Sequence, residues 1–425
     1  MTEFEPPVPD VRTAAPRRFA ALRNRSSRPY LFTSGLSMMA DNTEHVISYW
    51  VLWQTFHSPT LVGFQVISHW LPFLLLSVWS GSLAEKYDCR RIIQVAQALF
   101  MLVSIGWGVL FLTDSLSVGW ACVLLLGHGA AGALWAPAEQ MLLHDFVEKR
   151  DLPSAVRMNS TFQSLGILLG PVVGSVLLLQ LGPTVGIFVN VLLYLPMMIQ
   201  MGRTRFTGHV RDAADLDTPP RMTLCEVVRV LRSIGSNHVI VAMIVIGGLV
   251  AITVGNALPS AMPEFANGLA GRSGADATYG ALLFAMGLGG VVGGFLLEAT
   301  GLLKPSLRAA VLATVVFGGA VLAFSLTSSV VVALVVLVIA GMGEIASMSI
   351  AQSLVQLEAP AGERGRTLGV FGMFASGLRT GGGVTLGVVG TLLGVNGAIA
   401  IFSAVLVVGA LVAWGYAARA AANRV

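Results

Sequence analysis

The first long apolar run of the chain carries an unusual group of polar side chains. Asp41, Glu44, His45 and Ser48 lie at positions i, i+3, i+4 and i+7, so a helix places all four on one face. Each carboxylate in the middle of a membrane helix costs roughly 2.5 to 3.5 kcal/mol on insertion scales, so this face must meet water, a partner or a cavity. We expect it to carry protons or to bind substrate. The alternative is that Asp41 caps or cross-links helices.

A second pair of ionisable residues occurs late in the chain. Glu344 and Arg379 fall on neighbouring apolar runs, where an ion pair between them would lower the cost of both charges. Such a pair is one interpretation of Glu344. A gate or a proton carrier is the other, and the sequence leaves both open.

No catalytic or metal-binding motif accompanies these residues. His69 and His128 stand alone on apolar runs and are expected to line helix contacts, because no two histidines have the spacing of metal ligands. The three cysteines are isolated as well. A P-loop, a GxSxG sequence and an HExxH sequence are all absent. We therefore expect no enzyme activity, no cofactor, no metal site and no ATP-driven step within this chain.

The composition is that of a polytopic membrane protein. Hydrophobic residues make up 55% of the chain and charged residues 11%, and the mean hydropathy is +0.77. A soluble domain carries about 25% charged residues. The net charge of +4 comes from basic residues dispersed among short loops, as positive cytoplasmic loops would produce. Nucleic acid is therefore not an expected partner.

Twelve apolar spans fit between residues 30 and 419. If they alternate across the membrane, 24 of the 26 Lys and Arg residues fall on one side, which the positive-inside rule makes the cytoplasm. The prediction is an all-α protein of two six-helix bundles with both termini in the cytoplasm. Its parts are a tail at 1–29, a bundle at 30–202, a linker with a surface helix at 203–236, a bundle at 237–419 and a tail at 420–425.

The second half of the chain repeats the first. Gly81 and Glu85 recur 213 residues later as Gly294 and Glu298, again at the end of an apolar run and before a short basic loop. Two halves in the same orientation indicate a parallel duplication, which places a substrate site near the bilayer midplane between the bundles.

The charged stretch between the second and third spans has an ordered spacing. It contains Gly81, Glu85, Lys86, Asp88, Arg90 and Arg91. This spacing closely resembles the loop between helices 2 and 3 of the major facilitator superfamily of transporters. Three positions depart from the common pattern: Glu85 replaces an Asp, Asp88 replaces a Gly and Cys89 replaces a basic residue. The Asp88 variant is typical of the branch that includes the enterobactin exporter and the transmembrane secretion effectors.

The fifth span adds a second likeness to this branch. It contains Asn159, Gly170, Pro171 and Gly174. The Gly170-Pro171 step resembles the antiporter motif of exporters in the superfamily. The four-residue spacing of the glycines, which includes Gly166, also predicts close helix packing.

The resemblance implies a monomeric transporter in the cell (inner) membrane that works by alternating access. Its expected activity is proton-coupled export of an amphipathic small molecule, such as a drug, a siderophore or another secondary metabolite. It further implies a cytoplasmic latch, in which Glu85 lies near a helix N-terminus of the second half and Arg90 pairs with a nearby acid. Two alternatives remain open: a lysophospholipid flippase of the same fold, and a non-transporting membrane sensor.

We expect the coupling proton on Asp41 or Glu44, where a cationic substrate would compete with it. The candidate apolar walls of this cavity are Trp50, Trp53, Trp70 and Trp135.

Overall fold

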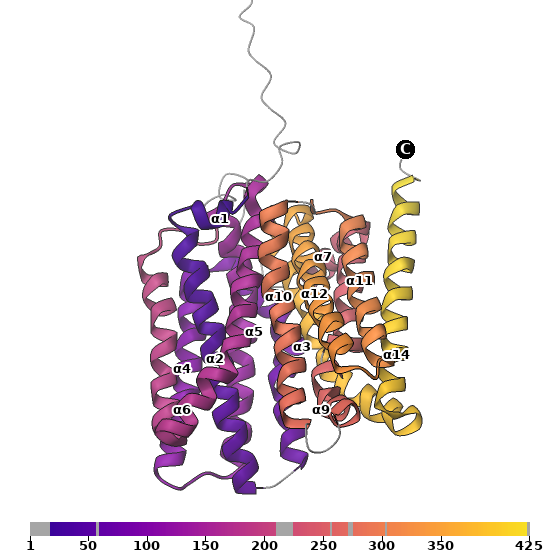
Figure 1. Ribbon diagram of the computed structural model, residues 1–425. Helices are drawn as coiled ribbons and strands as arrows, with labels where there is room; N and C mark the ends of the chain where they lie inside the picture. The colour runs from indigo at the N-terminus through magenta and orange to yellow at the C-terminus, as the bar shows by residue number, and fades with distance from the viewer. Residues whose placement is uncertain are drawn as a thin grey trace, which may run out of the picture.

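The protein is a bundle of long helices that stand side by side (Figure 1). The computed structural model describes residues 18–56, 59–209, 224–255, 257–270, 275–301 and 304–422, and within these ranges every regular element is helical. The all-α prediction is thereby confirmed. Helix α1, near the start of the described chain, and the C-terminal end of α14 lie at the same end of the molecule (Figure 1).

The first half packs α2 against α6, α3 against α5, and α4 against both α5 and α6. Its helices are α1 (Ala20–Arg23), α2 (Ser27–Phe56), α3 (Pro59–Lys86), α4 (Cys89–Leu112), α5 (Val118–Phe146) and α6 (Leu152–Arg203). A short 3-10 turn, Lys149–Asp151, connects α5 to α6. Gly182 interrupts α6 with φ of 74°, so this element consists of two helices joined at a kink.

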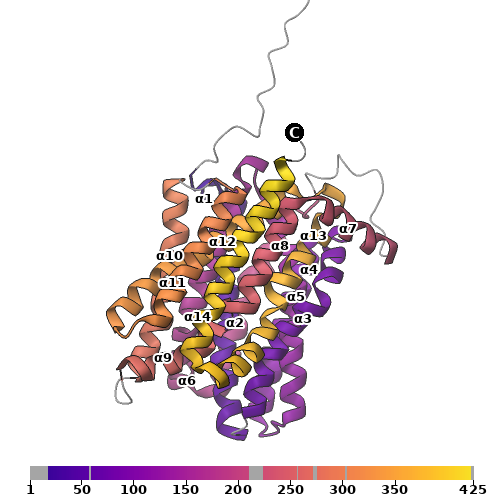
Figure 2. The ribbon, with the colours of Figure 1, turned by 90° about the vertical axis from the view of Figure 1, so that its right-hand side faces the viewer.

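The second half begins after a helix on the linker, α7 (Leu224–Ser236), which lies near the end of the molecule that carries the C-terminus (Figure 2). Its helices are α8 (His238–Val250), α9 (Ala257–Ala270), α10 (Ala275–Thr300), α11 (Leu307–Leu326), α12 (Val330–Glu358), α13 (Arg364–Gly372) and α14 (Arg379–Ala422). Two π-helical turns, Ala251–Gly255 and Met373–Gly377, follow α8 and α13, and a 3-10 turn, Ala361–Glu363, precedes α13. Thr223 and Glu226 have the spacing of a capping box at the start of this helix, but Thr223 lies outside the described residues.

The predicted repeat has counterparts in this architecture. Gly394 interrupts α14 with the same φ of 74° that Gly182 has in α6, 212 residues earlier. The contacts between the halves are also paired, because α3 meets α13 while α10 meets α6. A sequence offset of about 212 residues thus relates two helix kinks and two contacts between the halves, as a parallel duplication requires.

Nine segments of the described chain are long and apolar enough to cross a membrane. One of them runs from Lys149 to Arg203 and contains the kink at Gly182. Helix α2 is not among the nine, since Asp41 and Glu44 make its middle polar. The count of twelve spans stays a prediction.

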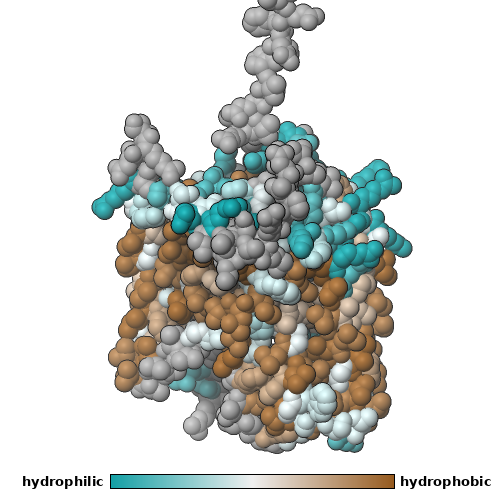
Figure 3. Space-filling model, turned by 180° about the vertical axis from the view of Figure 1, so that it is seen from behind, coloured by the Kyte–Doolittle hydropathy of each residue, from teal (hydrophilic) through white to brown (hydrophobic). Residues whose placement is uncertain are grey.

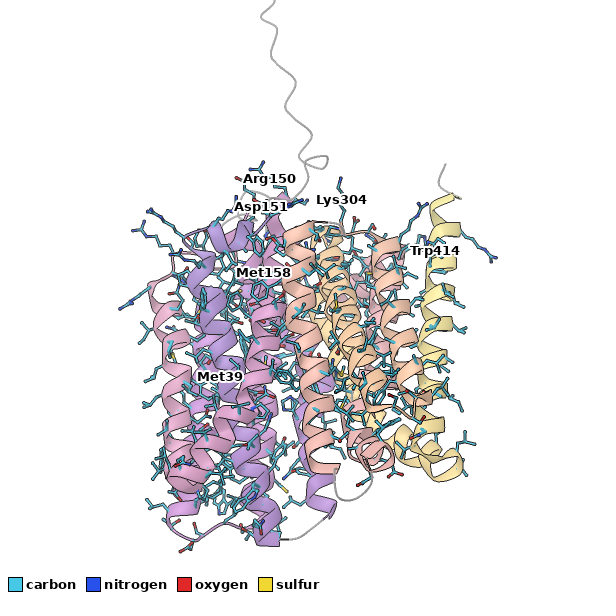
Figure 4. The ribbon with its side chains drawn as sticks, in the orientation of Figure 1. Met39, Arg150, Asp151, Met158, Lys304 and Trp414 are labelled. Carbon is cyan, nitrogen blue, oxygen red and sulfur yellow. The ribbon has the colours of Figure 1, made fainter. Side chains whose placement is uncertain are left out.

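The surface agrees with a bilayer environment. A broad apolar band covers the side of the molecule, and hydrophilic residues gather mainly at one end (Figure 3). Arg150 and Lys304, one from each half, lie at that same end (Figure 4). We call it the basic end, and the positive-inside rule predicts that it faces the cytoplasm.

Fusion of a reporter that is active only outside the cytoplasm tests this topology. Because basic residues gather at one end, we expect activity after fusion at His57, Asp114, Gly182 or Asn396, and none after Arg91 or Arg232. The opposite result at any internal loop would contradict the twelve-span topology.

Candidate functional site

Helix α2 is held tightly against α6 by the predicted row of glycines. A Cβ atom at Gly166 would lie 2.3 Å from the carbonyl oxygen of Gly35, and one at Gly170 would lie 2.4 Å from Asn42 Cβ. Thr43 Oγ1 donates a hydrogen bond of 3.2 Å to the carbonyl of Gly170. This contact fixes the rotation of α2 about its axis, and therefore the direction of its acidic face.

His128 of α5 lies between the two acids of that face. Its Nε2 is 2.6 Å from Asp41 Oδ1, and its Nδ1 is 2.9 Å from Glu44 Oε1. Ser104 of α4 donates a further, short hydrogen bond to Glu44 Oε2. Asp41, Glu44 and His128 are all at most 8% exposed. We call these three side chains the carboxylate–histidine cluster.

The cluster lies deep in the membrane-spanning part of the protein. Met39, two residues before Asp41, is near the middle of the height of the bundle (Figure 4). A buried carboxylate is costly unless it is paired and hydrogen-bonded, and here one imidazole serves both acids. Three titratable groups in one hydrogen-bonded chain can chemically take up and pass on a proton.

Two more histidines extend the cluster. The ring centroid of His45 lies 4.6 Å from that of His128 and 5.0 Å from that of His69 of α3. His45 Nδ1 is also 3.8 Å from Asp41 Oδ2. His69 and His128 line contacts between helices, as expected, but they are not isolated from each other, since their ring centroids lie 5.7 Å apart. These residues are on three separate helices, so spacing along the chain carried no signal of their proximity.

The second half contributes a cation and an acid next to these histidines. Arg379 Cζ lies 4.8 Å from the ring centroid of Trp70, whose own ring is 4.5 Å from that of His69. The guanidinium is 3.9 Å from Glu344 Oε1, so the predicted pair is at the outer limit of an ion pair. Arg379 Nε is buried and has no hydrogen-bond partner among the described residues. Histidines of the first half thus connect, through Trp70, to charges of the second half.

At the basic end, a buried acid of α3 is bonded to an arginine of α13. Glu85 accepts hydrogen bonds from the backbone N–H of Arg366 at 2.7 Å and from its Nε at 2.6 Å, and both side chains are about 5% exposed or less. Arg366 is in the first turn of α13. Glu85 therefore lies at the N-terminus of this helix, where the helix dipole favours negative charge. A Cβ atom at Gly81 would lie 2.3 Å from the carbonyl oxygen of Gly365, so glycine is required at this contact.

Arg90 pairs with a nearby acid, as predicted, and that acid is Asp88. Its side chain bonds Asp88 Oδ2 at 2.6 Å and the carbonyl of Thr204, just after α6, at 2.7 Å, so among the described residues its partners are in the first half and the start of the linker. Asp88 also caps α4 by accepting from the backbone N–H of Arg90. Burial opposes ionisation of Asp88, but these hydrogen bonds outweigh it and lower its pKa. Lys86 and Arg91 are exposed.

The repeat supplies a second contact of the same kind. Glu298 at the end of α10 is 3.0 Å from Arg157 Nε of α6, and it accepts a short hydrogen bond from Ser154. The backbone N–H of Phe19 donates to the same carboxylate at 2.7 Å. Arg157 and Arg366 were both missed as partners from the sequence. Only the repeat of Glu85 as Glu298 could have indicated that one acid of each half pairs with a group of the other half.

A further buried acid, Glu139 of α5, was also missed. It accepts hydrogen bonds from Tyr30, Ser34 and Gln163 at 2.9 to 3.2 Å, and Asn159 adds another. The signal was available, since an acid within an apolar run is the same feature that identified Glu44. All its partners lie in the first half, so this group cross-links helices α2, α5 and α6. Asn159 belongs to it, whereas Pro171 is exposed.

Solved structures of transporters share this architecture. A major facilitator superfamily transporter in the outward conformation matches with a TM-score of 0.70 at 14% identity, over 92% of this chain and 97% of that chain. A bacterial homologue of the iron transporter ferroportin matches with a TM-score of 0.69 at 15% identity, over 93% and 99%. A proton:xylose symporter of the same superfamily has a TM-score of 0.69 at 15% identity, over 92% and 95%. These likenesses establish the fold.

Sequence comparison agrees with this fold. The Staphyloferrin A transporter of Staphylococcus aureus (strain NCTC 8325 / PS 47) is 25% identical over 177 residues, which are 40% of this chain and 45% of that transporter. A family model described as transmembrane secretion effector matches residues 17–423. The family and the structural neighbours are membrane transporters, and the protein is a multi-pass membrane protein. The chain belongs to the transmembrane secretion effector family of the major facilitator superfamily.

Proposed function

We propose that the protein is a secondary active transporter that exports an amphipathic small molecule in exchange for protons by alternating access. The observation that carries the proposal is the position of His128, buried between Asp41 and Glu44 in the middle of the bundle. Ionisable groups inside a membrane span are costly, and such groups mark proton relays and substrate pathways. A structural cross-link would not need three titratable groups in one chain of hydrogen bonds.

The contacts at the basic end supply the gate of this mechanism. Glu85 with Arg366 and Glu298 with Arg157 each join one half to the other. These pairs hold the predicted cytoplasmic side shut, and an inward-facing state must break them. Alternating access then moves the carboxylate–histidine cluster from one side of the membrane to the other between proton uptake and release.

The substrate class follows from the groups near the junction of the halves. Asp41 and Glu44 offer negative charge. Arg379, whose Nε has no partner among the described residues, and the ring of Trp70 offer a place for an anionic or flat group. An amphipathic molecule with both kinds of group fits this arrangement. The sequence similarity to a staphyloferrin A transporter supports a siderophore or a related secondary metabolite as cargo. All of these residues come from one chain, so a monomer suffices.

Reconstitution into proteoliposomes tests this function. With an imposed pH gradient, we expect uphill movement of a siderophore-type substrate that collapses when a protonophore dissipates the gradient. A fluorescent lysophospholipid serves as the comparison. Transbilayer movement of the lipid without dependence on the gradient would overturn the proposal in favour of a flippase, and gradient-independent movement of every compound would overturn the coupling.

A further inference from the structure

Three histidines from three helices converge beside the carboxylate–histidine cluster. His45 of α2, His69 of α3 and His128 of α5 each place one ring nitrogen within 4.8 Å of those of the other two. His69 Nδ1 is buried and has no hydrogen-bond partner among the described residues. A buried imidazole nitrogen without a partner lacks the hydrogen bond that burial demands. A bound ligand can therefore supply the missing partner of this nitrogen.

The arrangement has the chemistry of a transition-metal site. Neutral imidazole suits Zn²⁺, Co²⁺, Ni²⁺ and Cu²⁺, and three protein ligands with one open position are a recurrent form of zinc site. Zn–N bonds of about 2.0 to 2.1 Å place tetrahedral ligand nitrogens roughly 3.4 Å apart. Small rotations of the side chains bring the three ring nitrogens from their present spacing, within 4.8 Å, to that distance.

The acids of α2 are in the place that outer ligands of a metal site occupy. Metal-bound histidines commonly donate their second ring N–H to a carboxylate, which fixes the ring and raises its basicity. Asp41 lies 3.8 Å from His45 Nδ1, and Glu44 lies 2.9 Å from His128 Nδ1. Glu44 then keeps its hydrogen bond to Nδ1 of His128. The ion binds Nε2 of the same ring and replaces Asp41, which contacts that nitrogen now. The freed carboxylate then offers the ion a neutralising charge or a fourth ligand.

We infer that His45, His69 and His128 form a binding site for a first-row divalent transition-metal ion in the first half of the protein. The ion joins α2, α3 and α5 beside the ring of Trp70, which lies 4.5 Å from that of His69. Spacing along the chain could not indicate this site, because each of the three histidines comes from a different helix. The inference goes beyond the proposed function, which needs no metal.

Binding of Co²⁺ to the purified full-length protein tests the site, with visible absorption as the readout. The protein carries an affinity tag free of histidine, and Zn²⁺ is added afterwards as competitor. We expect one Co²⁺ per chain, intense ligand-field bands of a four- or five-coordinate site, and their loss on addition of Zn²⁺. Outer-shell partners alone are worth about 10- to 100-fold in affinity. Loss of a ligand in His69→Gln or His45→Gln should therefore weaken binding by about 100-fold or more.

His209→Gln is the matched control. His209 contacts the backbone carbonyl of Tyr87 outside the bundle core, so its removal should leave the Co²⁺ spectrum unchanged. The inference is overturned if wild-type protein shows no saturable Co²⁺ bands, or if His45→Gln and His69→Gln, eluting as monodisperse protein, retain the wild-type spectrum and affinity. Transport driven by a pH gradient in a protein that does not bind Co²⁺ would contradict this inference but not the proposed function. Co²⁺ binding without gradient-driven transport would contradict the proposed function but not this inference.

Discussion

Replacement of His128 by Gln is expected to remove pH-gradient-driven transport. Gln cannot take up a proton, and it removes the imidazole that contacts both Asp41 and Glu44 in a buried setting. Breaking a buried charge pair costs about 3–5 kcal/mol, so lower thermal stability is expected as well. Uphill transport in proteoliposomes should fall to the level of empty vesicles. Thermal unfolding monitored alongside shows whether the variant remains folded at the assay temperature.

Asp41→Asn and Glu44→Gln separate coupling from folding. Each replaces an acid by a neutral group that still forms hydrogen bonds, so both variants should stay folded while losing uphill efflux and keeping downhill exchange. Thr33→Ala is the matched control, because Thr33 lies on the same helix two turns before Asp41 and its hydroxyl donates to the backbone carbonyls of Pro29 and Tyr30. It should pump like the wild type. If Asp41→Asn and Glu44→Gln also pump at the wild-type rate, the coupling site lies elsewhere, and Glu344→Gln becomes the next variant. A non-transporting sensor would show no uphill flux in any of them.

Replacement of Glu85 by Gln is expected to open the basic end of the protein. The change removes the charge that Arg366 and the N-terminus of α13 hold in a buried setting. A loss of about 3–5 kcal/mol in the closed state shifts the equilibrium between outward- and inward-facing states by at least about 100-fold. Double electron–electron resonance between spin labels on the two halves at this end should show longer distances.

The repeat and the loop structure provide comparisons for this prediction. Glu298→Gln should lengthen the same distances, because Glu298 joins α10 to Arg157 as Glu85 joins α3 to Arg366. Asp88→Asn should leave them unchanged, since Asp88 bonds Arg90 within the first half. Unchanged distances in Glu85→Gln, or an equal opening in Asp88→Asn, would contradict the role of Glu85 as the latch.

Residues that share one helix were paired correctly from the sequence alone. Asp41, Glu44 and His45 recur with helical spacing, and the 3.6-residue period of the helix places them on one side whatever surrounds it. The row of glycines that presses α6 against α2 follows the same rule. Composition, likewise, was enough to indicate a polytopic membrane protein, because a bilayer demands apolar helices about 20 residues long.

The contacts of the histidines with residues of other helices could not be predicted from the sequence. His128 meets Asp41 and Glu44, and His45 meets His69, only because α2, α3 and α5 have particular rotations about their axes. Those rotations are set by backbone approaches at glycine, such as Gly129 against the carbonyl of Ser68.

One side of the latch could be predicted from the sequence, and the other side could not. Its acid, Glu85, and Gly81 one turn before it were recognisable in the motif, since both belong to one short stretch at the end of α3. Its partner, Arg366, lies 281 residues further along the chain and could be identified only once α3 and α13 were in contact. Sequence alone determined which groups each helix presents, because local geometry decides the face. Tertiary structure decided which groups meet, because that depends on how close the backbones approach and how the helices are turned.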